Sequence, residues 1–165
     1  MKLLIKGGRI IDSASGFDRV SNLLIRDGKI DCFTDEIVEA DRTIDASGLI
    51  VSPGFIDMHM HEDPFDGQRG RPEQHIARSM ALMGVTTCMG GNCGENVYAP
   101  DAYLDAVDRF GSCVNIGLFA GHTFVRNACG GTDKYAPVDN ETLARMEVLA
   151  KEYLKKGCMG VSFGV

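Results

Sequence analysis

Two histidines separated by one residue, His59 and His61, are the first side chains of this sequence whose spacing could carry chemistry. On a β-strand, side chains at positions i and i+2 point to the same face, so both imidazoles could aim at one point. Neutral imidazole nitrogen is a common ligand of Zn²⁺ and other divalent transition metals. The spacing therefore predicts a metal site on a strand over residues 55–61. A chance alternation of histidine and methionine on a half-exposed strand is the alternative.

A second candidate is Cys93, which lies in a Gly-Gly-Asn-Cys-Gly segment directly after a predicted strand over residues 85–89. Glycines at such a turn allow the backbone to approach another group closely. The alternative is a tight turn with an incidental buried cysteine. Cys88, within the predicted strand, is expected in the core.

A third candidate group follows the next predicted strand and contains His122 and Arg126. His122 is predicted either to contact a substrate or to be a structural histidine. Glu62 and Asp63 directly follow the histidine pair. They are expected either to be hydrogen-bond partners of the two imidazoles or to lie solvated in a loop. His75 is expected on the surface.

The elements that must position these residues fall into two regions. The first region, about 50 residues long, contains short apolar runs between turn residues, including a hairpin signal at Asp27-Gly28, and is predicted to be all-β. Strands are predicted there over residues 3–6, 9–12, 22–26, 29–33, 42–45 and 49–51. After Pro53, strands alternate with helices, and this alternation predicts parallel strands joined by helical crossovers. The predicted strands are 55–61, 85–89, 114–120 and 159–163, and the predicted helices are 72–83, 100–110 and one from Asp139 or Asn140 to Gly157.

The segment from Val51 to His61 (VSPGFIDMHMH), placed after an N-terminal β region, resembles the opening of the amidohydrolase superfamily. The Gly-Asn-Cys-Gly turn, together with the Gly-Val-Thr-Thr segment at 84–87, resembles the N-acyl-D-amino-acid deacylase (D-aminoacylase) branch of that superfamily. The resemblance implies an α/β fold in which residues 1–52 are strands of a small β-sandwich domain. Residues 53–165 would then be the first half of a (β/α)8, TIM-like barrel.

The same resemblance implies a metal set and a reaction. His59 and His61 would bind one metal and Cys93 a second, with one or two Zn²⁺ ions or other divalent metals. The function implied is a metal-dependent hydrolase of linear amides that deacylates N-acyl-D-amino acids with a metal-activated water. The general-base aspartate and two further histidines are expected beyond Val165, so the 165-residue chain is expected to be an inactive fragment.

Two other functions stay open. A cyclic-amide hydrolase of the dihydroorotase or hydantoinase type usually carries a carboxylated lysine on the fourth strand, and residues 159–163 contain no lysine. A non-catalytic, truncated product is the other alternative, supported by the absence of the closing strands.

Composition limits the partners. The 17 basic and 23 acidic residues give a net charge of −6, which argues against nucleic acid, and 44% hydrophobic residues are typical of a globular protein. The sequence has no apolar run of the ~18 residues that a membrane span needs and no signal peptide. We therefore expect a cytoplasmic protein with a small-molecule substrate, six unbridged cysteines, and a tendency to self-associate through an open barrel edge.

Overall fold

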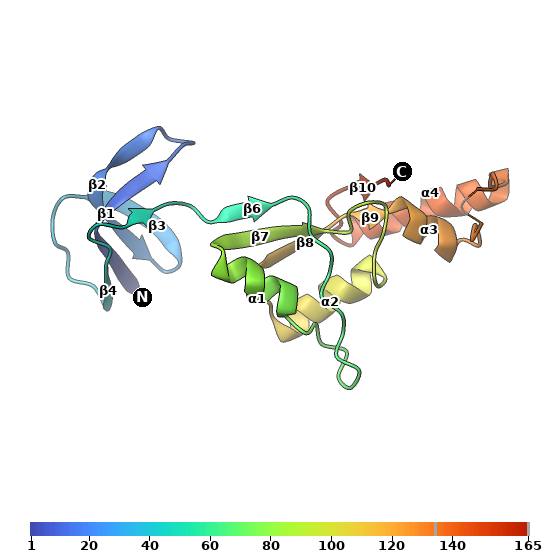
Figure 1. Ribbon diagram of the computed structural model, residues 1–165, viewed down its shortest axis with the longest axis horizontal. Coiled ribbons are helices and arrows are strands. Elements are labelled where there is room, and N and C mark those ends of the chain that lie inside the picture. Colours follow the sequence, from blue (N-terminus) through green and yellow to red (C-terminus); the bar gives the residue numbers. More distant parts are fainter. Residues whose placement is uncertain (134, 165) are drawn as a thin grey trace. The chain divides into compact units, whose positions relative to one another are not determined.

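The computed structural model describes residues 1–133 and 135–164, and the chain divides into two compact units, residues 1–53 and 54–165. Unit 1 contains strands only, whereas unit 2 combines strands with helices (Figure 1). The chain is therefore a mixed α/β protein. Among its described residues, no helix has both the length and the apolar character that are needed to cross a membrane.

Unit 1 is one five-stranded sheet built around its first strand. The neighbours in the sheet are β3-β2-β1-β4, and β5 also pairs with β1. The strands are β1 (Lys2–Asp12), β2 (Phe17–Arg26), β3 (Lys29–Thr34), β4 (Arg42–Asp45) and β5 (Ile50–Val51). The prediction of two strands at 3–6 and 9–12 was wrong, because β1 is continuous. The register with β2 shifts between Ile5 and Gly8, and Gly7 takes a φ of 70°, so the glycines form a bulge within one strand.

The hairpin predicted at Asp27-Gly28 is confirmed. Asp27 has a φ of 51° and Gly28 a φ of 79°, the two positive values that a type I′ turn requires. The predicted turn at 46–48 is also present, since the Leu49 amide donates to the Ala46 carbonyl at 2.8 Å. The strands on either side of that turn, β4 and β5, each pair in parallel with β1 rather than with one another.

Unit 2 has parallel strands, as the alternation predicted. Strands β6, β7 and β8 form one parallel sheet, and β9 and β10 form another parallel pair. The elements are β6 (Phe55–Asp57), α1 (His75–Leu82), β7 (Val85–Gly90), α2 (Pro100–Phe110), β8 (Asn115–Leu118), β9 (Ala120–Gly121), α3 (His122–Ala128), α4 (Asn140–Lys155) and β10 (Val161–Ser162). Helix α2 begins and ends as predicted. Asp139 caps α4, accepting a hydrogen bond from the Thr142 amide at 2.7 Å, which also agrees with the prediction.

Unit 2 differs from the predicted elements at four places. The strand predicted over 114–120 is in fact two strands, β8 and β9, which lie in different sheets. The strand predicted over 55–61 ends at Asp57, whose carboxylate accepts a hydrogen bond from the His59 amide at 2.8 Å and turns the chain. Helix α1 begins at His75 rather than near Pro72, because Pro72 forms a β-bridge with Phe65 and Gln74 is left-handed. Helix α3 was missed because a run of only seven residues carries too little periodicity.

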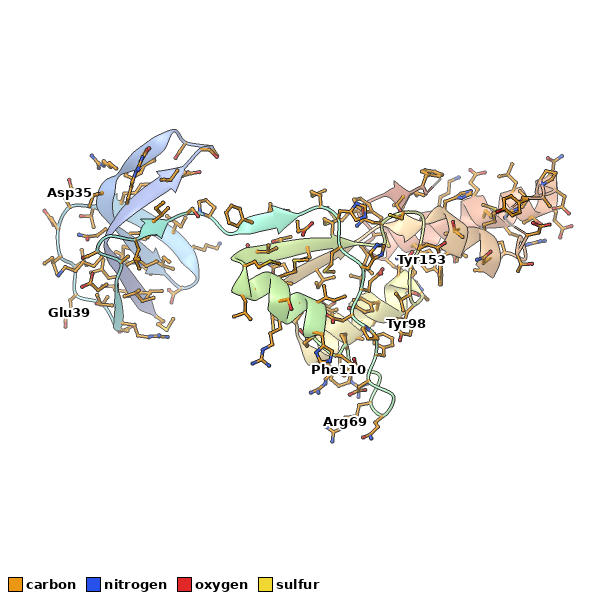
Figure 2. All side chains as sticks on the ribbon, in the orientation of Figure 1. Asp35, Glu39, Arg69, Tyr98, Phe110 and Tyr153 are labelled. Carbon is orange, nitrogen blue, oxygen red and sulfur yellow. The ribbon has the colours of Figure 1, made fainter. Side chains whose placement is uncertain are left out.

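Two apolar clusters hold unit 2 together. The larger cluster lies between the helices and the ends of β8 and β9, and its buried members are Tyr103, Leu118, Ala120, Val125, Met146, Tyr153 and Cys158. Tyr153, labelled in Figure 2, extends from α4 into this cluster. The smaller cluster joins α1 to β7 and contains Met60, Ala77, Cys88 and Val114. Cys88 is fully buried in it, which confirms its predicted place in the core.

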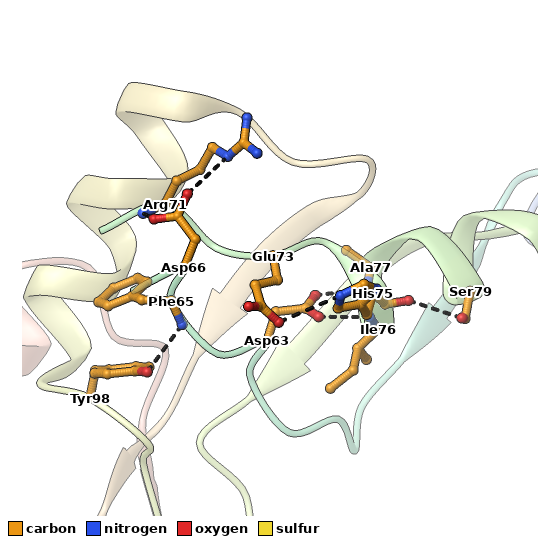
Figure 3. A network of polar contacts seen from close by, with 10 residues as sticks. All are labelled: Asp63, Phe65, Asp66, Arg71, Glu73, His75, Ile76, Ala77, Ser79 and Tyr98. Carbon is orange, nitrogen blue, oxygen red and sulfur yellow. Dashed lines mark hydrogen bonds and ion pairs between the residues drawn. The ribbon is translucent and has the colours of Figure 1, made fainter. Parts of the chain in front are cut away.

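Asp63 holds the start of α1, although the sequence suggested a solvated loop or a partner of the histidines. Its carboxylate is buried and accepts hydrogen bonds from the Ile76 amide at 2.7 Å and the Ala77 amide at 2.9 Å (Figure 3). These are two of the first-turn amides that a helix leaves without partners, and a negative charge there also complements the helix dipole. The same loop is fixed again where the Phe65 amide donates to the Tyr98 hydroxyl at 3.0 Å (Figure 3).

We predict that Asp63→Ala lowers the free energy of unfolding of unit 2 by about 1–3 kcal/mol, because it leaves two helix amides without an acceptor in a buried place. Urea denaturation followed by circular dichroism measures this loss. The control is Asp108→Ala, which removes an exposed carboxylate from the same unit. Equal stability of the two variants would contradict the capping role.

Candidate metal centre

The structure brings His59, His61 and Cys93 together. One nitrogen of each imidazole and the Cys93 sulfur all lie within 4.8 Å of one another, and the sulfur is 3.3 Å from Nε2 of His59. Donor atoms that share a tetrahedral zinc at about 2.0–2.3 Å are separated by roughly 3–4 Å, so this set needs little movement to close around an ion. All three residues are exposed, which gives an ion access to them. The donor set, two imidazoles and one thiol, fits Zn²⁺.

The histidines converge although they lie beyond the end of β6. The loop that carries them is held against the end of β7, since the Met60 amide donates to the Met89 carbonyl at 2.9 Å. The side-chain amide of Asn92 donates to both the Met60 carbonyl at 3.2 Å and the Met89 carbonyl at 2.6 Å. Asn92 thus connects the residue between the two histidines to the turn that carries Cys93. This loop geometry, rather than the predicted strand face, sets the two imidazoles.

Cys93 lies in a tight turn of unusual backbone. Its φ is 57°, Gly94 follows at 75°, and the Glu95 amide donates to the Asn92 carbonyl at 3.0 Å. For a residue that has a Cβ, the left-handed conformation costs about 1–2 kcal/mol relative to its preferred conformation. Strain of this kind is concentrated at functional sites, where the side chain is needed despite its cost. Asp27 and Gln74 share this conformation, so Cys93 is distinguished by the distance of its sulfur from His59 and not by its backbone alone.

The other cysteines differ from Cys93 in their surroundings. All six are free thiols, as expected; Cys32 and Cys113 are exposed, Cys129 is half-buried, and Cys88 and Cys158 are buried. Burial raises the pKa of the Cys88 thiol, and it raises the pKa of the Cys158 thiol to about 11. Cys88 and Cys158 are therefore protonated packing residues at neutral pH.

A buried polar network connects the loops around the site. The Asn96 amide donates to Oε1 of Glu62 at 2.9 Å and to the Phe119 carbonyl at 3.1 Å, while its oxygen accepts from the Gly121 amide at 2.7 Å. Glu62 is buried, and its second oxygen has no hydrogen-bond partner among the described residues. Neither of the two suggestions for Glu62, a partner of the histidines or a solvated side chain, was right. Asn96 was missed because its role depends on segments far away in the sequence.

A cleft of about 860 Å³ is lined by two of the three ligand candidates, His59 and Cys93. His122, at the start of α3, and Arg126, one turn further, both line it, so the structure places them beside His59 and Cys93. The His122 ring lies 5.2 Å from that of Phe163, and Arg126 donates to the Ala136 carbonyl at 2.6 Å. The complete lining is His59, Asn92, Cys93, Glu95, His122, Thr123, Arg126, Tyr135, Ser162, Phe163 and Gly164. His75 is exposed and lies outside this lining, as expected.

We predict that Asn96→Asp destabilises unit 2 by about 3 kcal/mol or more, because it places a second carboxylate beside the buried carboxylate of Glu62. The measurement is urea denaturation at neutral pH. Asn115→Asp is the matched control, because the Asn115 amide also donates to a backbone carbonyl but is exposed. A similar loss of stability in both variants would show that the buried position of Asn96 beside Glu62 is not what makes the added carboxylate destabilising.

No family model matches the chain. In sequence, it is 33% identical to a D-aminoacylase from Alcaligenes xylosoxydans xylosoxydans over 98% of this chain and 37% of that protein. In structure, it matches an N-acyl-D-glutamate deacylase from Bordetella bronchiseptica, complexed with zinc and a phosphonate inhibitor, with a TM-score of 0.84 and 29% identity. That match covers 98% of this chain and 38% of the neighbour.

A D-aminoacylase structure described as defining a subset of amidohydrolases matches with a TM-score of 0.82 and 26% identity, over 98% of this chain and 38% of that one. The chain is a relative of the D-aminoacylases. It spans little more than a third of the length of these relatives. A dihydroorotase from Streptococcus pneumoniae is 46% identical, but only over 52% of this chain and 20% of that protein.

Proposed function

We propose that this chain supplies part of the metal centre and part of the substrate cleft of an enzyme that hydrolyses the amide of N-acyl-D-amino acids. The observation that carries the proposal is the convergence of two imidazoles and one thiol within 4.8 Å beside the cleft. The D-aminoacylases and N-acyl-D-glutamate deacylase that it resembles over nearly its whole length support the substrate class.

His59, His61 and Cys93 would hold a divalent ion, for which zinc is our proposal. The donor set and the zinc named for the Bordetella neighbour support that choice. A bound zinc ion lowers the pKa of water to roughly 7 and polarises the amide carbonyl, which makes hydrolysis accessible at neutral pH. One or two ions are proposed, since a D-aminoacylase neighbour is described as having a binuclear metal centre.

The residues of the cleft would bind and orient the substrate. His122 lines the same cleft as His59 and Cys93 and would offer a ring nitrogen to a substrate polar group. Arg126 brings a positive charge to the same cleft, which suits a carboxylate. The general base that takes the proton from water, an aspartate, is proposed to lie outside these 165 residues, so the isolated chain would be inactive.

A cyclic-amide hydrolase is the second candidate function, favoured by the 46% identity to a dihydroorotase over about half of the chain. The segment around β10 (Val161–Ser162) contains no lysine that could be carboxylated, which favours the deacylase. A full-length protein that cleaves N-acetyl-D-amino acids but not dihydroorotate would decide between the two.

We also propose the domains to which the two units belong. Parallel strands that alternate with helices support unit 2 as the first half of a (β/α)8 barrel, and unit 1 would belong to a β-sandwich domain. Strand β10 pairs with β9 and with no second strand among the described residues, so self-association through this edge is proposed for the isolated chain alone, since the next strand of a complete barrel would cover it. A thiolate ligand works best in a reducing compartment, which supports a cytoplasmic location.

We predict that the purified chain takes up zinc on dialysis and that the double variant His59→Ala/His61→Ala takes up much less, because it loses two of the three donors. Elemental analysis per chain is the measurement. The control is His75→Ala, which removes an exposed imidazole outside the cleft and should keep the zinc content unchanged. Equal zinc in the double variant and in the wild-type chain would refute the metal role of the histidines.

We also predict that zinc selectively protects Cys93 from alkylation by iodoacetamide. Without metal, the exposed Cys32, Cys93 and Cys113 should react well before the buried Cys88 and Cys158. With Zn²⁺, the modification of Cys93 should fall while Cys32 and Cys113 serve as internal controls, as read by peptide mass spectrometry. If Zn²⁺ left the alkylation of Cys93 unchanged, Cys93 would not be a zinc ligand.

A further inference from the structure

The turn that carries Cys93 is held from a distant part of the chain, the segment at and after β10. The Ser162 hydroxyl donates to the Gly91 carbonyl and accepts from the Gly94 amide at 3.1 Å. One side chain therefore uses both its donor and its acceptor on the two sides of Cys93. The residues it joins are about 70 positions away in the sequence, separated from it by 71 and 68 residues.

Gly164 contacts the same turn through its backbone. A Cβ built on Gly164 would lie 2.1 Å from the Cys93 carbonyl oxygen and 2.8 Å from its carbonyl carbon. These atoms are backbone, so they cannot rotate away as a side chain could. Gly164 has no positive φ, so the need for glycine here comes from the closeness of Cys93 and not from its own conformation.

The start of α3 holds the opposite side of the turn. The amides of Thr123 and Phe124 donate to the Gly94 carbonyl at 2.8 and 3.3 Å. Ser162 pairs with Gly121, the residue immediately before α3, so the β9–β10 pair brings both contacts to one place. The left-handed conformation of Cys93 is thus maintained by hydrogen bonds to both of its flanks.

We propose that Ser162 and Gly164 are positioning residues for the Cys93 thiolate, so that the metal affinity of the site depends on them although neither is a ligand. The Ser162 hydroxyl fixes the two ends of the turn, and the bare Gly164 backbone allows the Cys93 peptide to lie where its sulfur reaches the two histidines. This inference rests on the proposed metal site and adds β10 to the elements that build it.

The test is a Co²⁺ titration of the 165-residue chain and four variants, followed by the thiolate-to-cobalt charge-transfer absorption. Ser162→Thr and Ser162→Val add the same bulk, and only the first keeps the hydroxyl. The Cβ added by Gly164→Ala would lie 2.1 Å from the Cys93 carbonyl oxygen. The Cβ added by the matched control, Gly160→Ala, would come no closer than 3.4 Å to its neighbour, the Phe119 ring. We expect Ser162→Val and Gly164→Ala to lower the affinity about tenfold or more and to weaken the thiolate band, as loss of supporting contacts does at other metal sites.

Ser162→Thr and Gly160→Ala should bind Co²⁺ as the wild-type chain does. A general packing defect at position 162 would affect the threonine and valine variants alike, and that result would overturn the role of the hydroxyl. Wild-type affinity and band intensity in all four variants would overturn the whole inference. A wild-type chain that shows no thiolate band at all would instead refute the proposed metal role of Cys93, so the two failures are distinguishable.

Discussion

Much of unit 2 depends on the parallel pairing of β6 with β7. Because the two strands run in the same direction, their carboxyl ends meet at one edge, and the loops that leave them are neighbours in space. The histidine loop follows the first strand and the Cys93 turn follows the second, so a sulfur and an imidazole 34 residues apart lie 3.3 Å from one another. The sequence provides the side chains that can bind a metal, and the parallel sheet brings them close together in space.

Buried polar side chains at this edge of the sheet hold the loops in fixed positions. Asn92 joins the carbonyl between the two histidines to the end of β7, and Asn96 joins the loops after β6 and β8. Asp63 ties the same stretch to the first turn of α1. Each of these side chains satisfies backbone groups that irregular segments would otherwise leave without partners in the interior. Order in the loops is therefore achieved without regular secondary structure.

The sequence predicted the elements that follow from local propensity and capping, and it missed those that depend on particular contacts. The Asp27-Gly28 turn, helix α2 and the Asp139 cap follow from local rules of conformation and capping. The early end of β6 and the late start of α1 follow from Asp57 and from the Phe65–Pro72 bridge, which no periodicity records. The pairing of His59 with His61 followed from their spacing and the metal role of Cys93 from the family resemblance, but the roles of Asn96, Glu62 and Ser162 required coordinates.

The separation of about 70 residues between Ser162 and the turn it spans has a consequence for synthesis. A ribosome releases residues 91–94 long before residue 162, so the Cys93 segment first emerges without two of its hydrogen bonds. The contact between Gly164 and the Cys93 carbonyl is formed later still. The Cys93 turn therefore remains without these contacts until residues 162–164 have also been synthesised.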